Sequence, residues 1–304
     1  MQLTGLHHIT MITGDAQQNV DFYAGVLGLR LVKKTVNFDA PEAYHLYFGD
    51  EQGSPGSILT WFEFAGAPRG RAGLGMIHTL QLGVASEASL GFWADRLDRA
   101  GRATTRGGGS LRFEDYDGLA LELVVTDQPP LRAEHPEVPA DHAIASLEGA
   151  RAYSEYAGVP EAVLTEVLGF THLGSGAYEL AGTDRRFRWA YDPAPDAPGR
   201  QGAGTVHHVA WATPDDDQPA WQQRIRAAGA YVTPVRDRDY FRSICFREPR
   251  GVLFEIATLG PGFAVDEDPG HLGEELRLPK QHEHLRPRLE STLTPVENPR
   301  RIAA

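Results

Sequence analysis

The sequence is short of cysteine, of basic residues and of long apolar runs. Its single cysteine, Cys245, excludes a disulfide within the chain and favours the reducing cytoplasm. Lys and Arg number 29 against 41 Asp and Glu, and the formal net charge of -12 argues against binding to nucleic acid or to an anionic membrane. No stretch approaches the roughly 20 apolar residues of a membrane span, and the N-terminus lacks the basic and apolar regions of a signal peptide. We therefore expect a cytoplasmic protein without a nucleic-acid or membrane partner.

Turn-forming residues, in contrast, are plentiful. The 304-residue chain contains 33 glycines and 21 prolines, while its hydrophobic fraction of 41% is ordinary for a globular protein. This composition favours short strands joined by many turns over long helices. At about 150 residues per domain, the length predicts two domains or one large one.

One order of elements, a strand, a helix and three further strands, recurs along the chain. In its first copy, a half-buried strand at residues 6–13 precedes a helical stretch with Asp15 as N-cap and Gly28 at its end. Later copies keep this order, the third is the weakest, and the fourth predicts a strand at residues 231–237 after its helix. We predict an α+β fold of four βαβββ modules and an extended tail, bounded as module 1 at 1–66, module 2 at 74–126, module 3 at 142–193, module 4 at 204–259 and the C-terminal tail at 260–304.

Two of the predicted first strands carry the same rare string of two histidines. One contains His7 and His8, and the other contains His207 and His208, 200 residues later. Because neighbours in a strand point to opposite faces, we expect one imidazole of each pair on the concave side of its sheet. Neutral imidazole suits Fe, Mn, Zn or Ni, whereas the alternative interpretation is a hydrogen-bonded or surface histidine.

A carboxylate lies in the last predicted strand of the fourth module. Glu255 stands in GVLFEIAT between apolar neighbours, and a carboxylate in such surroundings is rarely buried unless it is paired or bound to a metal. The alternative is a glutamate that faces solvent from a half-exposed strand. Two histidines and one carboxylate form the facial triad of non-haem Fe(II) oxygenases, whose open positions admit substrate and O2. The sequence therefore predicts a metal site made of His8, His208 and Glu255.

The equivalent positions of the other modules are less complete. Module 1 has Thr60 at the carboxylate position, and module 2 has Thr79 at the histidine position but Glu122 at the carboxylate position. Module 3 has His142 near its start and no acidic residue in its last strand. A second site from Glu122 and His142 stays open, but the sequence favours a half without metal.

The segments that carry these residues, GLHHITMITGD, GTVHHVAWAT and DRDYFRSICFREPRGVLFEIAT, resemble the vicinal oxygen chelate superfamily. Within it they are most similar to ring-cleaving dioxygenases of the hydroquinone type, and the tail pattern LPxxxExxRxxLE at 278–290 agrees. The resemblance implies two open barrels, with modules 1 and 4 sharing the metal barrel. It also implies Fe(II) at His8, His208 and Glu255, although Mn, Zn or Ni is an alternative in purified protein.

The resemblance extends to residues around the ligands. His7 and His207 precede the two ligands and are candidates for hydrogen bonding to substrate or for acid–base catalysis. Thr10 follows His8 by two residues, on the same face of the strand. Arg238 and Tyr240 lie in DRDYFRS, which would reach the mouth of the barrel. Arg238 is a candidate for neutralising a phenolate or superoxide, with a plain surface charge as the alternative.

Two positions depart from the family pattern. Cys245 stands where tyrosine is usual, which predicts a roomier and less polar pocket, and Arg250 stands where glycine is usual. The leading hypothesis is an Fe(II)-dependent extradiol-type dioxygenase that acts with O2 on a hydroquinone or catechol, in a homo-oligomer. The alternatives are a glyoxalase-like metal-dependent isomerase or lyase, in which Thr60 would replace a usual second carboxylate, and a non-catalytic binder of small aromatics.

Overall fold

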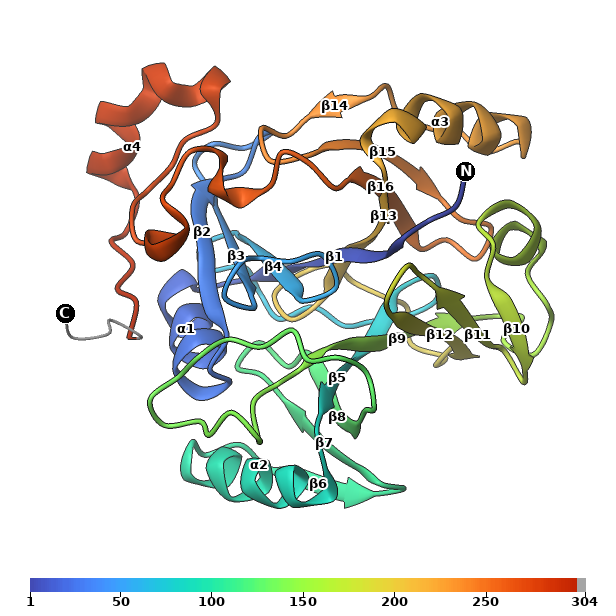
Figure 1. Ribbon diagram of the computed structural model, residues 1–304, viewed down its shortest axis with the longest axis horizontal. Helices are drawn as coiled ribbons and strands as arrows, with labels where there is room; N and C mark the ends of the chain where they lie inside the picture. Colours follow the sequence, from blue (N-terminus) through green and yellow to red (C-terminus); the bar gives the residue numbers. More distant parts are fainter. Residues whose placement is uncertain (300–304) are drawn as a thin grey trace.

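The computed structural model describes residues 1–299, which fold around two β-sheets (Figure 1). The strands of the first sheet are β1 (Gly5–Thr13), β2 (Arg30–Val36), β3 (Tyr44–Gly49), β4 (Ile58–Glu63), β13 (Val206–Thr213), β14 (Arg236–Asp237), β15 (Arg242–Arg247) and β16 (Leu253–Thr258). They are ordered β14-β15-β16-β13-β1-β4-β3-β2. The first and the last parts of the predicted repeat therefore share one sheet, as the sequence predicts.

The second sheet is built from the middle of the chain. Its strands are β5 (Ile77–Val84), β6 (Thr104–Gly107), β7 (Ser110–Glu114), β8 (Ala120–Val125), β9 (Ser146–Ser154), β10 (Thr171–Gly174), β11 (Ala177–Ala181) and β12 (Arg186–Pro193). Their order, β10-β11-β12-β9-β5-β8-β7-β6, repeats that of the first sheet. In each sheet, two first strands pair antiparallel at the centre, β1 with β13 and β5 with β9.

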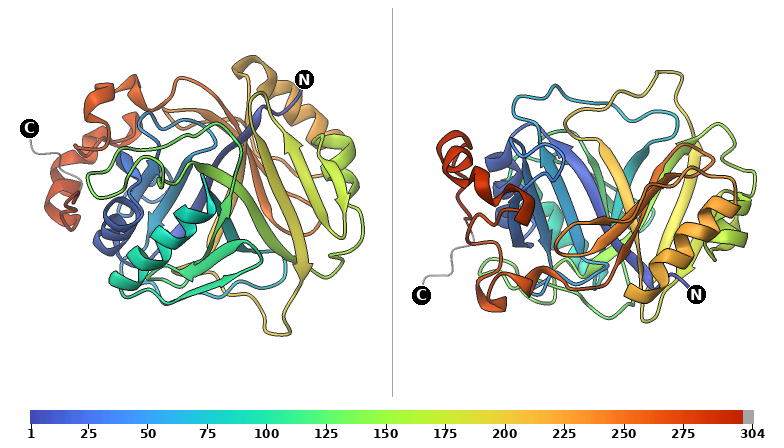
Figure 2. Two further views of the ribbon diagram at one scale, coloured as in Figure 1. Left: turned by 60° about the horizontal axis from the view of Figure 1, so that its bottom comes forward. Right: turned by 90° about the horizontal axis from the view of Figure 1, so that it is seen from above.

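Helices cover the outside of the sheets (Figure 1, Figure 2). They are α1 (Ala16–Val20), which continues as the π-helical η1 (Asp21–Val26), α2 (Glu87–Arg99), the π-helical η2 (Val163–Val167), the 3₁₀ turn η3 (Asp215–Asp217) and α3 (Gln218–Ala227). The Asp15 side chain accepts a hydrogen bond from the amide of Gln18 and caps α1, as predicted. Gly28 follows η1 with a φ of 71°, a conformation that glycine adopts without strain.

A continuous hydrophobic core joins the two sheets. All nine residues of the central strand β1 are buried, which explains why its apolar residues lack a strict alternation. On β13, Trp211 packs edge-on against Phe187 of β12 at 5.3 Å between ring centroids, so the sheets are in direct contact. Among residues 1–299, no helix is both long and apolar enough to cross a membrane.

Two predicted elements differ from the structure. The strand expected over residues 231–237 is reduced to the two-residue β14, because Pro234 has no amide hydrogen to donate to a neighbouring strand. The tail is not extended throughout. It contains the 3₁₀ turns η4 (Phe263–Val265), η5 (Pro269–His271) and η6 (Lys280–Leu285), and the helix α4 (Arg286–Thr292).

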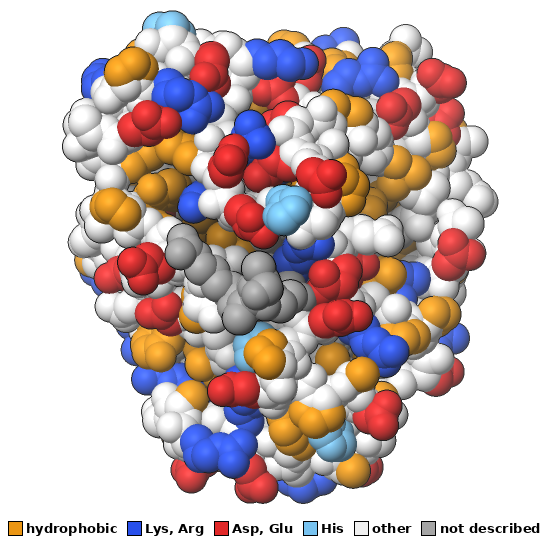
Figure 3. Space-filling view, turned by 60° about the vertical axis from the view of Figure 1, so that its left-hand side comes forward, with side chains coloured by type: hydrophobic (Ala, Val, Ile, Leu, Met, Phe, Trp, Pro, Cys, Tyr) orange, Lys and Arg blue, Asp and Glu red, His pale blue; other side chains and the backbone are white. Residues whose placement is uncertain are grey.

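The helical part of the tail is explained by its leucines. Leu285, Leu289 and Leu293 are four residues apart, and they pack with Leu278 against Val36 of β2. The surface that carries this segment shows interspersed acidic and basic side chains rather than a field of one sign (Figure 3). Residues 300–304 of the predicted tail lie outside the described residues.

Candidate metal centre

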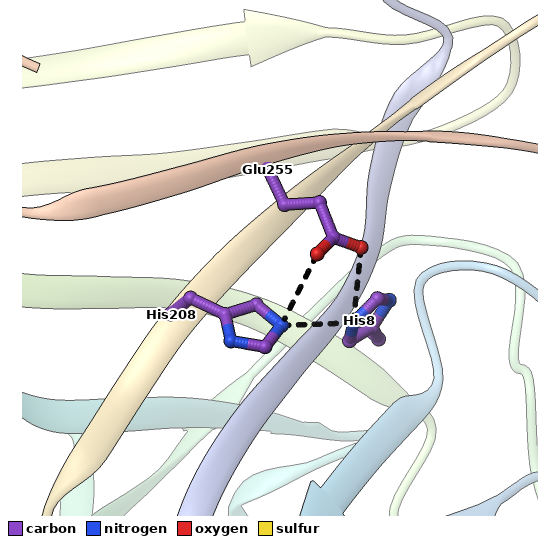
Figure 4. Close-up of side chains that lie close together, drawn as sticks. All are labelled: His8, His208 and Glu255. Atoms are coloured by element: carbon purple, nitrogen blue, oxygen red, sulfur yellow. Dashed lines mark hydrogen bonds and ion pairs between the residues drawn. The ribbon is translucent and has the colours of Figure 1, made fainter. Parts of the chain in front are cut away.

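Three neighbouring strands of the first sheet bring the predicted ligands together (Figure 4). His8 lies on β1, His208 on β13 and Glu255 on β16. The Nε2 atoms of the two histidines are 3.3 Å apart, and each lies 3.7 Å from a different carboxylate oxygen of Glu255. All three side chains are buried. The described part of the chain contains no other group of three His, Cys, Asp or Glu side chains with this geometry.

A β-bulge lies beside each histidine ligand. In the pairing of β1 with β13, Leu6 faces Trp211 and His8 faces Ala210, which leaves His7 as an extra residue. A second shift leaves His207 extra on β13. The expectation that the two imidazoles of each pair point to opposite faces is therefore wrong, because a bulge re-aims the side chain of its extra residue.

Each ligand imidazole instead contacts its own neighbour. The Nδ1 atoms of His7 and His8 are 2.8 Å apart, and so are those of His207 and His208. A neutral ligand that presents Nε2 to a metal carries its proton on Nδ1, so the neighbouring Nδ1 accepts that proton in a hydrogen bond. His7 then carries its own proton on Nε2, and burial lowers its pKa to about 4, although the Thr258 backbone acts in the opposite direction.

The charges of the site suit a divalent cation. Burial lowers the pKa of His8 and of His208 well below its ordinary value, so both imidazoles are neutral. Burial raises the pKa of Glu255 to about 7, although the Arg238 charge acts in the opposite direction. One oxygen of Glu255 accepts a hydrogen bond from the Cys245 thiol at 3.3 Å, whereas Oε1 is buried without a hydrogen-bond partner.

Two features test whether a metal ion fits this site. They are Oε1 of Glu255, which is buried without a hydrogen-bond partner, and the distance between the Nε2 atoms of His8 and His208. Two nitrogen ligands about 2.1 Å from one ion and roughly 90–110° apart lie about 3.0–3.4 Å from each other. The Nε2 atoms of His8 and His208 meet this distance at 3.3 Å. Two neutral imidazoles and one carboxylate therefore fit a divalent transition metal.

The candidate metal centre opens into a small pocket of about 40 Å³. Besides the three ligands, the pocket is lined by Asn37, Phe38, Asp39, His45, Tyr47, Phe62, Arg238 and Phe241. Of these, only Arg238 was predicted from the sequence. Cys245 does not line the pocket, since its thiol donates to Glu255, and the enlargement expected from the missing tyrosine stays a prediction.

His45 lines the pocket, but the sequence did not identify it as a candidate site residue. Its Nε2 lies 2.8 Å from the Thr60 hydroxyl, and its Nδ1 accepts from or donates to the Tyr47 hydroxyl at 2.9 Å. Thr60 in turn bonds to the Thr10 hydroxyl at 3.0 Å. Thr10 therefore lies in a buried polar chain that reaches the pocket through His45 and does not line the pocket itself. A lone histidine in YHLYFGD gave no sequence signal.

Tyr240 lies beside a different cavity. With His7 and Phe241 it lines a cavity of about 480 Å³, and its hydroxyl donates to Asp266 at 3.2 Å. The Lys33 ammonium lies 4.8 Å from the centre of its ring. Tyr240 is thus separated from the metal pocket by Phe241, which lines both spaces.

The second sheet places its candidate residues apart. Glu122 accepts hydrogen bonds from Gln81, Ser110 and Arg112. His142 contacts Ser89 and stacks on Phe92 at 4.7 Å.

Thr60 and Glu255 occupy equivalent positions in the first sheet, as the sequence predicts. Thr60 of β4 pairs with Thr10 of β1, and Glu255 of β16 pairs with Ala210 of β13.

Arg250, the second departure from the family pattern, has a structural partner. Its guanidinium forms an ion pair with Glu161 at 3.0 Å between Nε and Oε2, and it lies 5.0 Å from the Tyr156 ring. Both partners belong to the segment that precedes η2. The arginine therefore ties the turn before β16 to the second sheet's half of the molecule.

Comparison with known proteins agrees with this geometry. The inferred ring-cleaving dioxygenase MhqO of Bacillus subtilis (strain 168) is 44% identical, with 96% of each chain covered. The chlorohydroquinone/hydroquinone 1,2-dioxygenase of Sphingobium indicum (strain UT26S) is 32% identical, again over 96% of each chain. A crystal structure of an inferred dioxygenase from B. subtilis superimposes with a TM-score of 0.92 at 43% identity, over 98% of each chain.

More distant structures share the fold alone. Glyoxalase I from Zea mays superimposes with a TM-score of 0.60 at 15% identity, covering 84% of this chain and 92% of that one. The sequence model of one family matches residues 5–123 and 163–256. These matches span both parts of the chain that form the first sheet, and the chain belongs to the glyoxalase/bleomycin resistance protein/dioxygenase superfamily.

Proposed function

We propose that the protein is an Fe(II)-dependent extradiol-type dioxygenase that cleaves the ring of a hydroquinone or catechol. The observation that carries this proposal is the convergence of His8, His208 and Glu255 on one side of a pocket, which leaves the remaining side open. Relatives that are named ring-cleaving dioxygenases over nearly the whole chain support it.

Fe(II) held by these ligands would bind an aromatic oxygen and O2 and let electron density pass between them. The protein's own residues supply orientation and charge. Arg238 is the one permanently charged cation that lines the pocket in the described part of the chain, and its charge suits a phenolate. Phe38, Phe62 and Phe241 provide apolar walls that exclude water from an aromatic ring.

Three further histidines surround the ligands, and their hydrogen bonds decide what each can do. His7 and His207 each accept a hydrogen bond from a ligand imidazole, and burial lowers the pKa of both below the ordinary value. Both rings are therefore neutral near pH 7, but Nδ1 accepts from the ligand and Nε2 carries the ring's own proton, so they orient the ligands and do not take a proton from a substrate hydroxyl. His45, held by Thr60 and Tyr47, is a third neutral imidazole at the pocket wall.

The test is O2 consumption by protein loaded with Fe(II) in the absence of air. We expect uptake with at least one member of a panel of methyl- and chloro-substituted hydroquinones and catechols, and none with the His208→Ala variant. Protein loaded with Mn, Zn or Ni serves as the comparison for metal identity. Absence of O2 uptake across the panel, with Fe(II) shown to be bound, would overturn the proposal.

The structure does not favour the isomerase alternative. A second carboxylate would have to stand at Thr60, but that hydroxyl is engaged with Thr10 and His45. Conversion of a glutathione-type hemithioacetal by Zn- or Ni-loaded protein, without O2, would restore this alternative. We also propose a cytoplasmic homo-oligomer, which sedimentation of the purified protein and cell fractionation would check.

A further inference from the structure

The metal pocket is too small for the ring that the proposed function requires. Its volume is about 40 Å³, whereas a cavity of roughly 150 Å³ is known to take up benzene and a single water needs about 10–15 Å³. The pocket in this conformation therefore holds only water-sized contents. At least one wall has to move before an aromatic ligand reaches His8, His208 and Glu255.

One wall is a short connection rather than a strand. Residues 37–39, which we call the 37–39 segment, follow β2 and contribute three of the lining residues. The carboxylate of Asp39 joins this segment to the opposite half of the barrel, with Oδ2 at 3.3 Å from Arg238 and Oδ1 at 3.2 Å from Arg236. The Arg238 guanidinium also lies over the Phe38 ring at 5.4 Å.

The other side of the segment is held without charge. The side chains of Gln281 and His282, on η6 of the tail, each lie 2.9 Å from the carbonyl oxygen of Phe38. The Asp39 side chain is 63% exposed, whereas that of Arg238 is 19% exposed. The Asp39 end of the segment is therefore exposed to solvent, while two side chains of the tail contact the Phe38 carbonyl.

The positive charge of Arg238 interacts both with the three candidate ligands and with Asp39. It acts electrostatically on Glu255 and on His8 and His208, which places it within range of the metal centre. Its guanidinium forms two donor contacts with the single oxygen Oδ2 of Asp39. An oxygen of an aromatic ligand that enters the pocket would compete with Oδ2 of Asp39 for the charge and the terminal N–H groups of Arg238.

We propose that Asp39 is a specificity-determining residue, whose carboxylate holds Arg238 until a second oxygen of an aromatic ligand displaces it. This inference rests on the proposed function and names a residue that would select its diol substrates over rings with one oxygen. The ligand is an aromatic diol, with one oxygen at the metal centre and the other in place of the Asp39 carboxylate on Arg238. A ring with a single oxygen cannot serve both positions.

The strength of the exposed Asp39–Arg238 ion pair determines how much its removal should change ligand binding. Pairs of this kind contribute an amount equivalent to roughly 1.5- to 5-fold in an equilibrium constant. Asp39→Asn keeps the size of the side chain and removes its charge, so we expect the Kd of methylhydroquinone to fall by about that factor. The Kd of phenol, which has one oxygen, should change less in Asp39→Asn than the Kd of methylhydroquinone does.

The chain offers a matched control on the same connection. Glu42 is also exposed and paired, with Arg288 at 2.7 Å, but it does not line the pocket. Glu42→Gln therefore removes the same charge from the same loop without touching Arg238. Binding is measured by calorimetry on metal-loaded protein without O2, and hydrogen exchange of the peptide that contains residues 37–39 is followed without metal or ligand.

The outcomes separate the two proposals. Tighter binding of methylhydroquinone and faster exchange over residues 37–39 in Asp39→Asn, with Glu42→Gln unchanged in both, support the role of Asp39. If the wild-type protein binds methylhydroquinone but Asp39→Asn binds it no more tightly than Glu42→Gln does, this inference is wrong while the proposed function stands. If the wild-type protein neither binds nor oxidises any diol, the proposed function is wrong and this inference is overturned with it.

Discussion

Replacement of His7 by phenylalanine should weaken metal binding although His7 is not a ligand. The His7 ring lies 2.8 Å from the Nδ1 of His8 and is 3% exposed, so water has no access to replace the lost hydrogen-bond acceptor. Phenylalanine keeps the ring volume and the contact with Phe241, whose centroid lies at 4.9 Å. The substitution thus isolates the hydrogen bond from the packing.

The expected loss of metal affinity is known for residues that hydrogen-bond to a metal ligand. Loss of a group that orients a metal-bound imidazole costs about 10- to 100-fold in metal affinity, which corresponds to about 1.4–2.7 kcal/mol. His207 has the same 2.8 Å contact with His208 but is only partly buried, so solvent can replace part of its bond. We therefore expect His207→Phe to cost less than His7→Phe.

The assay is competition for Zn(II) or Fe(II) with a chelator of known affinity. Thermal unfolding of the metal-free variants checks that both remain folded, and His7→Gln should recover part of the affinity because its amide oxygen accepts a hydrogen bond. Wild-type affinity in His7→Phe, or a larger loss in His207→Phe than in His7→Phe, would refute the assigned proton positions.

Three further predictions concern other parts of the structure. Glu255→Gln should lose most of its metal affinity, because the amide retains the shape but not the charge of the ligand; dialysis and metal analysis would show this. Lys33→Met should lower the free energy of unfolding by about 3–5 kcal/mol in urea titrations, since it leaves the buried Glu267 and the adjacent Asp266 without their ammonium partner. Asp115→Asn should flatten the pH dependence of stability between about pH 4 and pH 6, as followed by thermal unfolding.

The pKa of Asp115 in the folded protein determines whether stability rises or falls with pH. Burial raises the pKa of Asp115 from 3.8 to about 6, although hydrogen bonds from Leu119 and Tyr23 act in the opposite direction. The folded protein therefore holds a proton that the unfolded chain releases, and stability falls as the pH rises through this window. The contribution reaches at most about 1.4 kcal/mol per pH unit. An unchanged slope in Asp115→Asn would contradict it.

Controls for the other two predictions lie in the same chain. Lys280→Met removes a lysine whose side chain is 87% exposed and should leave the unfolding free energy within about 0.5 kcal/mol of wild type. If it destabilises as much as Lys33→Met, burial is not the cause. Retention of wild-type metal affinity by Glu255→Gln would remove the carboxylate from the ligand set.

The repeat and the paired histidines made much of the fold predictable. The strings that contain His8 and His208 identified two equivalent strands, and strand pairing then required the first and last segments to share a sheet. The position of Glu255 followed because it lies on the strand next to that pair. Local sequence was sufficient wherever pairing between equivalent strands decided the geometry.

Prediction stopped where a single residue breaks that regularity. Strand alternation placed His7 and His207 on the wrong side, because a bulge depends on how two strands pair and not on either strand alone. His45 and Asp39 reach the pocket from strand β3 and from a loop, positions with no distinctive residue pattern. Pro234 interrupts the predicted strand at 231–237, because proline has no amide hydrogen to donate to a neighbouring strand.

The separation of the two histidine ligands along the chain also bears on how the protein is made. His8 and His208 are 200 residues apart, and the strands of the second sheet are synthesised between them. A growing chain therefore contains every strand of the second sheet before both histidines of the proposed metal site exist, so the ion cannot bind both while those strands are being made. Metal affinity instead measures how well the first and last segments have closed on each other. Substitutions along β1 or β13 that touch no ligand should show up as weaker metal binding before they show up as lost secondary structure.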